Sequence, residues 1–115
     1  MLTDGTEQRQ FLYAEDCCEA LETVMNCYSD FKPTDPLHIT SFNATSIQQI
    51  AAIIQGQFNL IGKYDVKIKP GLAKDSVQMD KRNEADTYIT GWWTPKTTID
   101  QGIAKVFAEM KKHYE

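Results

Sequence analysis

The sequence predicts a mixed α/β (α+β) fold, organised as one small domain over residues 1–115. Short runs rich in aromatic and β-branched residues alternate with longer runs whose apolar residues recur at helical spacing, which is typical of such folds. Two capping-box patterns mark helix starts. At 115 residues the chain can bury one modest core. The predicted order is strand, helix, strand, helix, strand, helix, helix, which makes about three strands and four helices.

In the first half, Asp4-Gly5 predicts a turn, and the aromatic residues of 10–14 (QFLYA) predict a strand. Acidic residues then open a helix, for which Asp16 is the expected N-cap. The apolar positions of this helix are Cys17, Leu21, Val24, Met25 and Tyr28. A loop with two prolines ends the helix, and residues 37–42 (LHITSF) are the second predicted strand.

Ser46 and Gln49 form a capping box that opens a second helix. Residues 64–69 alternate in polarity, so they predict a third strand, which the proline and glycine after it end. Residues 80–88 predict a short polar helix.

The chain ends in a turn that carries two tryptophans, over residues 91–97, and a final helix. Thr98 and Gln101 form the capping box of this helix. Its expected buried residues are Ile99, Ile103, Val106, Phe107, Met110 and Tyr114.

The composition is that of an ordinary globular protein, with 42% hydrophobic residues, 24% charged residues and a net charge of −4. No basic stretch indicates nucleic acid, and no apolar run approaches the roughly 18 residues of a membrane span. We expect no signal peptide. Cys17, Cys18 and Cys27 fit neither a disulfide framework nor a zinc site. They predict reduced thiols in small core positions of a cytoplasmic protein, although a reactive thiol is an alternative.

The residue types offer little catalytic chemistry. The two histidines are His38 and His113, which lie far apart in the sequence, and His38 is expected to be structural. The sequence has no nucleophile elbow and no glycine-rich phosphate loop. We therefore predict no catalytic residue and no metal ligand.

A possible anion site remains, because Arg9 precedes a predicted strand and three lysines surround another: Lys67, Lys69 and Lys74. The planar donor fork of arginine suits phosphate. The alternative is that Arg9 pairs with Asp4 or Glu7 on the surface.

Four segments in order resemble one known family. They are DGTEQRQFLYAEDCCEAL, LHITSFNATSIQQIAAII, KIKPGLAKDSVQMDKRNEA and GWWTPKTTIDQGIAKVFAEM. They are similar to GDGxQxRDFxYVDDxAxA, YNIGxGxxxSIxELAxxI, KPGDxxRxxxDxSKA and LGWxPKTSLEEGIxKTxxWY of the extended short-chain dehydrogenases/reductases, the NAD-dependent nucleoside-diphosphate-sugar epimerases and dehydratases. Together they cover nearly the whole chain with compatible spacing.

The resemblance assigns to Arg9 a contact with the phosphates of a nucleotide sugar. It assigns a supporting contact to Lys74, where the family usually has an arginine. Gln10 replaces the usual acid after the arginine, and Asn43 would supply any left-handed conformation that the family's glycine-rich segment needs. The resemblance also implies that Trp92 or Trp93 packs under the last helix.

The resemblance implies a small C-terminal, substrate-binding lobe without a complete Rossmann domain. The family's NAD(P)-binding turn and its tyrosine-x-x-x-lysine pair have no counterpart here, since Tyr28 and Lys32 have this spacing by coincidence. We therefore expect no cofactor bound by this chain alone and no activity alone, whether it is a piece of an enzyme or half of a split one. The alternative is a non-catalytic interaction or oligomerisation module that lost the ligand.

The expected partners are a nucleotide sugar and either a homo-oligomer or a separate Rossmann-type chain. Without such a domain, Leu37 and Ile39 on a strand edge and parts of the Cys17 to Tyr28 stripe would lose their cover. This predicts a dimer or larger oligomer.

Overall fold

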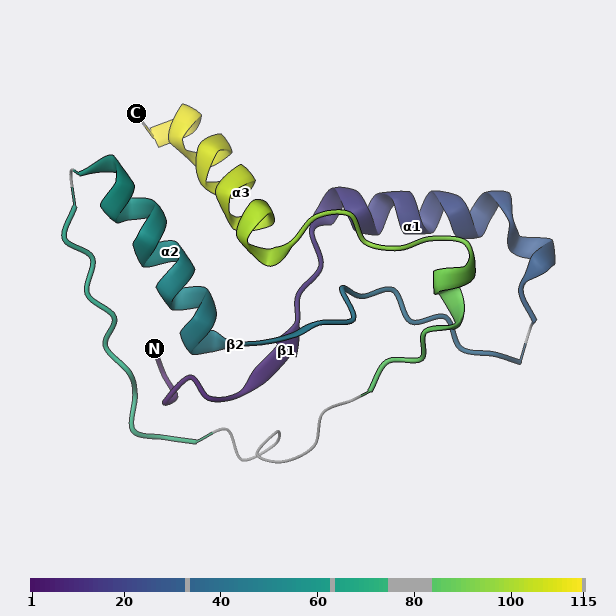
Figure 1. Cartoon of the computed structure of the whole chain (residues 1–115), viewed down its shortest axis with the longest axis horizontal. Helices are drawn as coiled ribbons and strands as arrows, with labels where there is room; N and C mark the ends of the chain where they lie inside the picture. Colours follow the sequence, from purple (N-terminus) through teal and green to yellow (C-terminus); the bar gives the residue numbers. More distant parts are fainter. Residues whose placement is uncertain (33, 63, 75–83, 115) are drawn as a thin grey trace.

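The computed structural model describes residues 1–32, 34–62, 64–74 and 84–114 (Figure 1). These described residues contain three α-helices: α1 (Ala14–Asn26), α2 (Ile47–Ile61) and α3 (Ile99–Tyr114). The strands β1 (Gln8–Gln10) and β2 (Ala44–Ser46) form one sheet, and 3₁₀ turns lie at Tyr28–Asp30 and Tyr88–Gly91. The predicted mixed α/β fold is confirmed. Within the described ranges no helix has the length and apolar character needed to cross a membrane.

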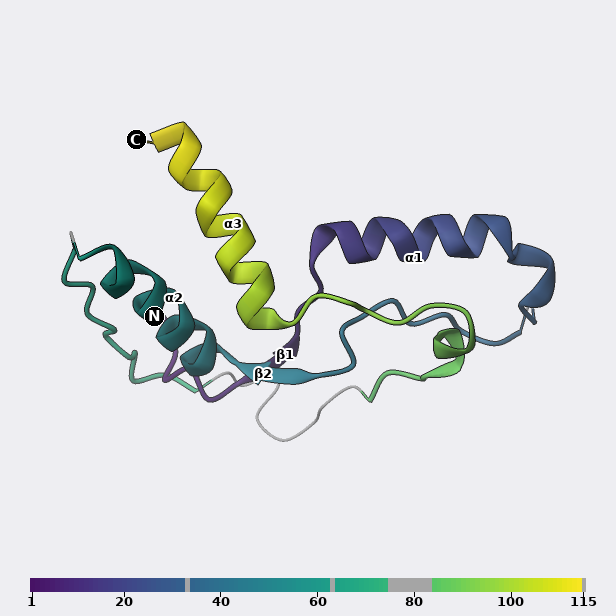
Figure 2. The same ribbon diagram turned by 45° about the horizontal axis from the view of Figure 1, so that its top comes forward.

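The molecule is a flat plate of 52 × 37 × 17 Å. The sheet lies at its centre, with α1 on one side and the α2–α3 pair on the other (Figures 1 and 2). β1 and β2 run antiparallel, with Arg9 opposite Thr45 at the middle of the register. An isolated parallel bridge between Thr3 and Ala73 extends the pairing beyond β1.

The predicted strand positions were wrong. The first strand ends at Gln10, and Ala14 already belongs to α1. Residues 37–42 and 64–69 form no strand. In residues 37–42, the side chains of Leu37, Ile39 and Phe42 pack on the core instead. A short apolar sequence does not distinguish a strand from a loop that packs on the core.

The alternation within residues 64–69 does correspond to burial, because Val66 and Ile68 are half-buried while their neighbours are exposed. Two carbonyls of this segment accept hydrogen bonds from a side chain and from the amino terminus, not from a neighbouring strand. The Gln55 side-chain amide donates to the Val66 carbonyl at 2.6 Å, and the amino terminus donates to the Lys69 carbonyl at 2.9 Å.

The predicted helix over residues 80–88 was also wrong in its described part. Residues 84–87 are not helical, and a 3₁₀ turn begins at Tyr88; residues 80–83 lie outside the described residues. Tyr88 lies in an aromatic cluster with Phe31 and Trp92, whose ring centroids are 4.6 to 6.2 Å apart.

Both capping boxes are confirmed. The Gln49 amide N–H donates to Ser46 Oγ at 3.1 Å, and the Gln49 side chain accepts from the Ser46 N–H at 2.8 Å. Thr98 and Gln101 make the equivalent pair, at 3.3 and 3.0 Å. These bonds satisfy N–H groups that a helix start leaves without intrahelical partners.

Asp16 is not the N-cap of α1, because Tyr13 holds that position without a side-chain cap. The Asp16 carboxylate is 4% exposed and points across the molecule to the segment before α3. It accepts from the Thr97 N–H at 2.8 Å, the Lys96 N–H at 3.2 Å and Thr97 Oγ1 at 3.3 Å. A buried carboxylate is stable only when its oxygens are paired in this way.

The core is small. Its fully buried apolar residues among those described are Ala20, Ile89 and Trp93, with half-buried side chains packed around them: Leu12, Val24, Leu37, Ile39 and Phe42. Trp93 therefore packs against α1, and Trp92 against the aromatic cluster, rather than under α3 as predicted. The expectation for the cysteines holds in part, because Cys17 and Cys27 are half-buried while Cys18 is exposed.

We expect Asp16→Ala to lower the free energy of unfolding by about 2–4 kcal/mol, because it leaves two N–H groups at residues 96 and 97 without their acceptor. Urea denaturation followed by circular dichroism measures the loss. Asp100→Ala, an exposed acid in the first turn of α3, is the matched control. A change for Asp16→Ala no larger than that of the control would contradict this role.

Candidate functional site

Arg9 occupies the centre of the two-stranded sheet. It is half-buried, and side-chain alternation places it on the face opposite Gln8 and Gln10. Its Nη1 donates to the Gln8 carbonyl at 3.0 Å, and the Gln10 side chain accepts from Thr40 Oγ1 at 2.9 Å. The strand therefore holds the base of the Arg9 side chain on an ordered backbone.

Polar atoms lie buried beside Arg9. The side-chain oxygens Glu7 Oε2 and Gln8 Oε1 are buried, and neither has a hydrogen-bond partner in the described part of the chain. The other Glu7 oxygen, Oε1, accepts from Thr3 Oγ1. This edge of the sheet therefore contains buried polar atoms.

Lys74 is exposed and lies next to the turn that precedes β1. The Gly71 N–H donates to the Thr3 carbonyl at 2.8 Å, and the Asp4 N–H donates to the Ala73 carbonyl at 2.8 Å. Hydrogen bonds from Thr6, and to a smaller extent the charge of Lys74, lower the pKa of Asp4. Lys74 thus lies close to an acid that offsets part of its charge.

Arg9 lies in the middle of β1, whereas Lys74 follows Ala73, which bridges to Thr3 ahead of β1. Asp4 and Arg9 are five positions apart, a span of at most about 17 Å along the chain. Of the other lysines in the predicted cluster, Lys67 pairs with Asp65 at 3.5 Å. The Asp4 carboxylate accepts from the N–H and the hydroxyl of Thr6.

The expected left-handed residue was misplaced by one. Phe42 has φ +58°, and Asn43 does not have a positive φ. The Phe42 side chain packs against the core, so the turn before β2 is held by packing rather than by an asparagine.

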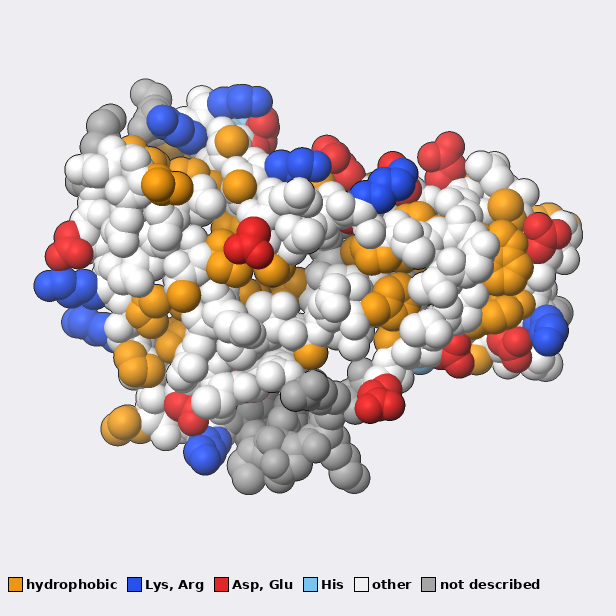
Figure 3. Space-filling view, viewed as in Figure 1, with side chains coloured by type: hydrophobic (Ala, Val, Ile, Leu, Met, Phe, Trp, Pro, Cys, Tyr) orange, Lys and Arg blue, Asp and Glu red, His pale blue; other side chains and the backbone are white. Residues whose placement is uncertain are grey.

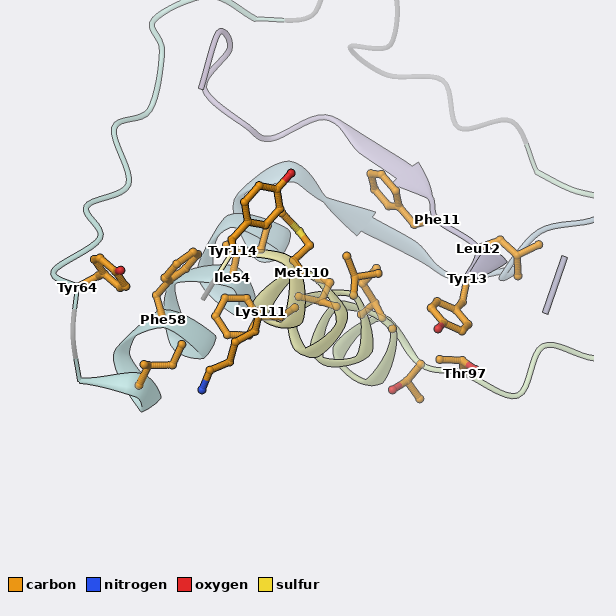
Figure 4. Close-up of a pocket in the computed structure, with 17 residues that line it drawn as sticks. Phe11, Leu12, Tyr13, Ile54, Phe58, Tyr64, Thr97, Met110, Lys111 and Tyr114 are labelled. Carbon is orange, nitrogen blue, oxygen red and sulfur yellow. The ribbon is translucent and has the colours of Figure 1, made fainter. Parts of the chain in front are cut away.

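An apolar groove lies between α2 and α3 and has a volume of about 670 Å³. Figure 4 shows Ile54 and Phe58 of α2 and Met110 and Tyr114 of α3 around it, with Phe11 at its inner end. Phe58 packs edge-to-face on Phe107 at 4.9 Å between centroids. The expected inward face of α3 thus lines an open groove, and Val106 remains 48% exposed.

Sequence reasoning missed this groove. The available signal was α2, which has no charged residue over 15 positions. The helical spacing of the apolar residues in this segment predicts a buried stripe, yet no α2 residue is fully buried; the stripe is Ile47, Ile50, Ala51, Ile54 and Phe58. A helix of such composition is usually covered on most sides.

Other candidates have structural roles. The Asp86 N–H donates to His38 Nδ1 at 2.7 Å, which ties two loops together as expected of a structural histidine. The part of the chain that the structure describes has no group of three His, Cys, Asp or Glu residues able to hold a metal ion.

Comparisons with known proteins support the resemblance drawn from the sequence. The chain is 30% identical over 105 residues to a GDP-L-fucose synthase of Sinorhizobium fredii, a match that covers 90% of this chain and 31% of that protein. The crystal structure of a UDP-galactose 4-epimerase matches with a TM-score of 0.65 at 18% identity, over 96% of this chain and 35% of that one. No family model matches. The chain therefore spans about a third of the length of these relatives.

The sequence match confirms the resemblance to an extended short-chain dehydrogenase/reductase, and both matches are consistent with a C-terminal part of one. At 18% identity the structural match establishes the fold. The fold is that of a small lobe without a full Rossmann domain.

The position of Lys74 depends on Gly71, because a Cβ at Gly71 would lie 2.3 Å from the Leu2 carbonyl oxygen. We expect Gly71→Ala to lower the free energy of unfolding by about 1–3 kcal/mol, as overpacking does elsewhere. Amide exchange at Gly71 and Asp4 should become faster. Gly56→Ala is the control, since its Cβ meets nothing within 4 Å and replacing a helical glycine should stabilise by up to about 1 kcal/mol. Equal effects of the two changes would contradict the close approach.

Proposed function

We propose that this chain supplies a nucleotide-sugar-binding lobe of the extended short-chain dehydrogenase/reductase type, in which Arg9 contacts the diphosphate. The names of both relatives contain a nucleoside diphosphate linked to a sugar, which supports this substrate class. Which sugar and which base this chain would take stays open. We further propose that residues 1–115 form one domain.

The observation that carries the proposal is the setting of Arg9. A half-buried guanidinium on a paired strand is partly shielded from water, so its bonds to phosphate oxygens are stronger than those of a free surface arginine. Its Nη1 donates to the Gln8 carbonyl at 3.0 Å. The backbone that presents it is fixed by the register with β2.

Lys74 has a smaller role in this proposal. A lysine is a point charge without the planar fork, and here it lies beside Asp4. It would contribute general attraction for a diphosphate rather than a defined bidentate contact.

The resemblance also implies NAD(P) in the full-length family. No glycine-rich turn joins a strand to a helix among the residues described here, and such a turn is where a dinucleotide's phosphates bind. These residues do not fit the cofactor, so the proposal contains no hydride-transfer step. We also propose a cytoplasmic location from the odd number and the spacing of the cysteines.

The apolar groove favours a second candidate, an interaction or oligomerisation module that has kept the fold. Binding of a nucleotide sugar distinguishes the two candidates. A module that lost the ligand would bind neither UDP-sugars nor GDP-sugars.

We expect the chain alone to show no epimerase, dehydratase or reductase turnover with NAD or NADP. The reason is that it spans about a third of its relatives and offers no cofactor turn in its described part. A panel of UDP-sugars and GDP-sugars assayed with both cofactors tests this. Cofactor-dependent turnover by the purified chain would reject a purely binding role.

We expect Arg9→Ala to weaken the binding of a nucleotide sugar by one to two decades, which corresponds to the loss of a charge-assisted contact of about 1.5–3 kcal/mol. Arg9→Lys should restore part of the affinity, because the charge returns without the fork. Titration calorimetry at high ligand concentration measures both variants. Lys67→Ala removes an exposed lysine and is the control. If Arg9→Ala and Lys67→Ala bind equally well, Arg9 has no specific role.

A further inference from the structure

The turn at Asp4 and Gly5, just before β1, has a chemically reactive sequence. It is the only Asp-Gly pair of the chain, and the chain has no Asn-Gly pair. In such a pair the backbone nitrogen of the glycine can attack the carboxyl carbon of the aspartate side chain, because glycine has no side chain to obstruct the approach. The product of this attack is a five-membered succinimide ring. The turn therefore joins a structural role to a possible covalent change.

The fold requires the glycine of this pair. Gly5 has φ +81°, a conformation that residues with a Cβ rarely adopt. A Cβ at this position would lie 2.8 Å from Gln48 Cγ and 3.2 Å from the Gln48 backbone nitrogen. The Gly5 carbonyl accepts from the Gln48 N–H at 2.9 Å, so this close approach ties the turn to the start of α2. The packing thus excludes the larger residues that would slow the attack.

The peptide group between Asp4 and Gly5 is held at both ends. Its carbonyl oxygen, which belongs to Asp4, accepts from the Gln48 side-chain amide at 2.8 Å. Its N–H, which belongs to Gly5, donates to Thr3 Oγ1 at 3.3 Å. The attacking nitrogen has to give up its proton and approach the side-chain carbon from outside the plane of the carboxyl group. Both hydrogen bonds restrict these movements.

The Asp4 carboxylate is held as well. Its Oδ1 accepts from the Thr6 hydroxyl at 2.7 Å and from the Thr6 N–H at 3.0 Å, which forms an Asx turn. These bonds, the hydroxyl bond first, lower the pKa of Asp4. The side chain is therefore kept as a carboxylate, from which an oxygen leaves less readily than from a carboxylic acid. The Asp4 N–H donates to the Ala73 carbonyl at 2.8 Å, so the main-chain groups of both turn residues are bonded.

From these contacts we propose that Asp4 is a latent site of isoaspartate formation, which the hydrogen bonds with Thr3, Thr6 and Gln48 keep closed in the folded chain. When the turn opens, the Gly5 nitrogen bonds to Asp4 Cγ, and the hydroxyl of the protonated side chain leaves with the amide proton as water. Water then opens the ring at one of its two carbonyl carbons. One opening regenerates aspartate, and the other leaves Gly5 joined to Cγ as isoaspartate.

Water is the only co-reactant, and it reaches the turn. Figure 3 shows the surface at this place, at its lower left, where an acidic and a basic side chain lie side by side. Isoaspartate adds one carbon to the main chain between Thr3, which bridges to Ala73, and Gln8, which begins β1. The change therefore shifts the bridge relative to the sheet, and it does not depend on a bound nucleotide sugar.

Incubation of the full chain at neutral pH and body temperature tests the proposal. Enzymatic methylation measures the yield of isoaspartate, and peptide mapping by mass spectrometry locates it at residue 4. The same chain unfolded in guanidinium chloride is the reference. We expect formation to be slower in the folded chain by about tenfold or more, because more than one hydrogen bond has to break first.

Two variants at exposed positions of the folded chain test the hydrogen bonds themselves. Gln48→Ala and Thr6→Val each remove one side-chain hydrogen bond to Asp4, and circular dichroism checks that they stay folded. Each should speed isoaspartate formation about two- to tenfold, the factor that one hydrogen bond of ordinary net strength gives. Gln57→Ala, on α2 away from the turn, is the matched control and should leave the rate unchanged.

Isoaspartate that forms at residue 4 as fast in the folded chain as in the unfolded chain would overturn the proposal, and so would its absence from the unfolded chain. Two further results would overturn it: wild-type rates in Gln48→Ala and Thr6→Val, or rises that only match the loss of overall stability of each variant in urea denaturation. A rise beyond that loss, confined to these two variants, supports it.

Discussion

The structure depends on the buried carboxylate of Asp16. It stands in the first turn of α1, and its hydrogen bonds end on Lys96 and Thr97, some 80 positions away in the sequence. Those residues lead directly into α3, so one side chain fixes where the last helix begins relative to the first. The core beside it contains few buried apolar residues. The free-energy cost of burying an unpaired carboxylate would exceed the stabilisation that such a core provides.

The two-stranded sheet joins the halves of the plate in a different way. Three residue pairs define its register, and the Gly5 turn with φ +81° lets the chain reverse just before it. The Gly5 carbonyl accepts from the Gln48 N–H at 2.9 Å, which ties this turn to the first residues of α2. Arg9 is thus presented by a segment anchored at both ends, although a two-stranded ribbon is marginal by itself.

The sequence predicted helices far better than strands, and the reason is physical. α2 and α3 begin with capping boxes whose side-chain bonds are local, so a few residues specify each start. The apolar runs at 37–42 and 64–69 have the alternation of strands, but pairing needs a neighbouring strand that local sequence cannot guarantee. The role of Asp16 was not predictable either, because its partners are distant and a helix N-cap was the local expectation.

The proposed phosphate contact and the groove share one stretch of backbone. Arg9 lies in β1, and Phe11 to Tyr13, which line the groove, follow within four residues. Any protein surface that packs on the groove would immobilise this stretch of backbone. Less conformational entropy would then be lost when Arg9 binds a ligand. Linkage requires the reverse effect to be equal, so a bound nucleotide sugar would favour closure of the groove by the same factor. Because the core is thin, the position of Arg9 therefore depends on what covers the apolar residues that follow its strand.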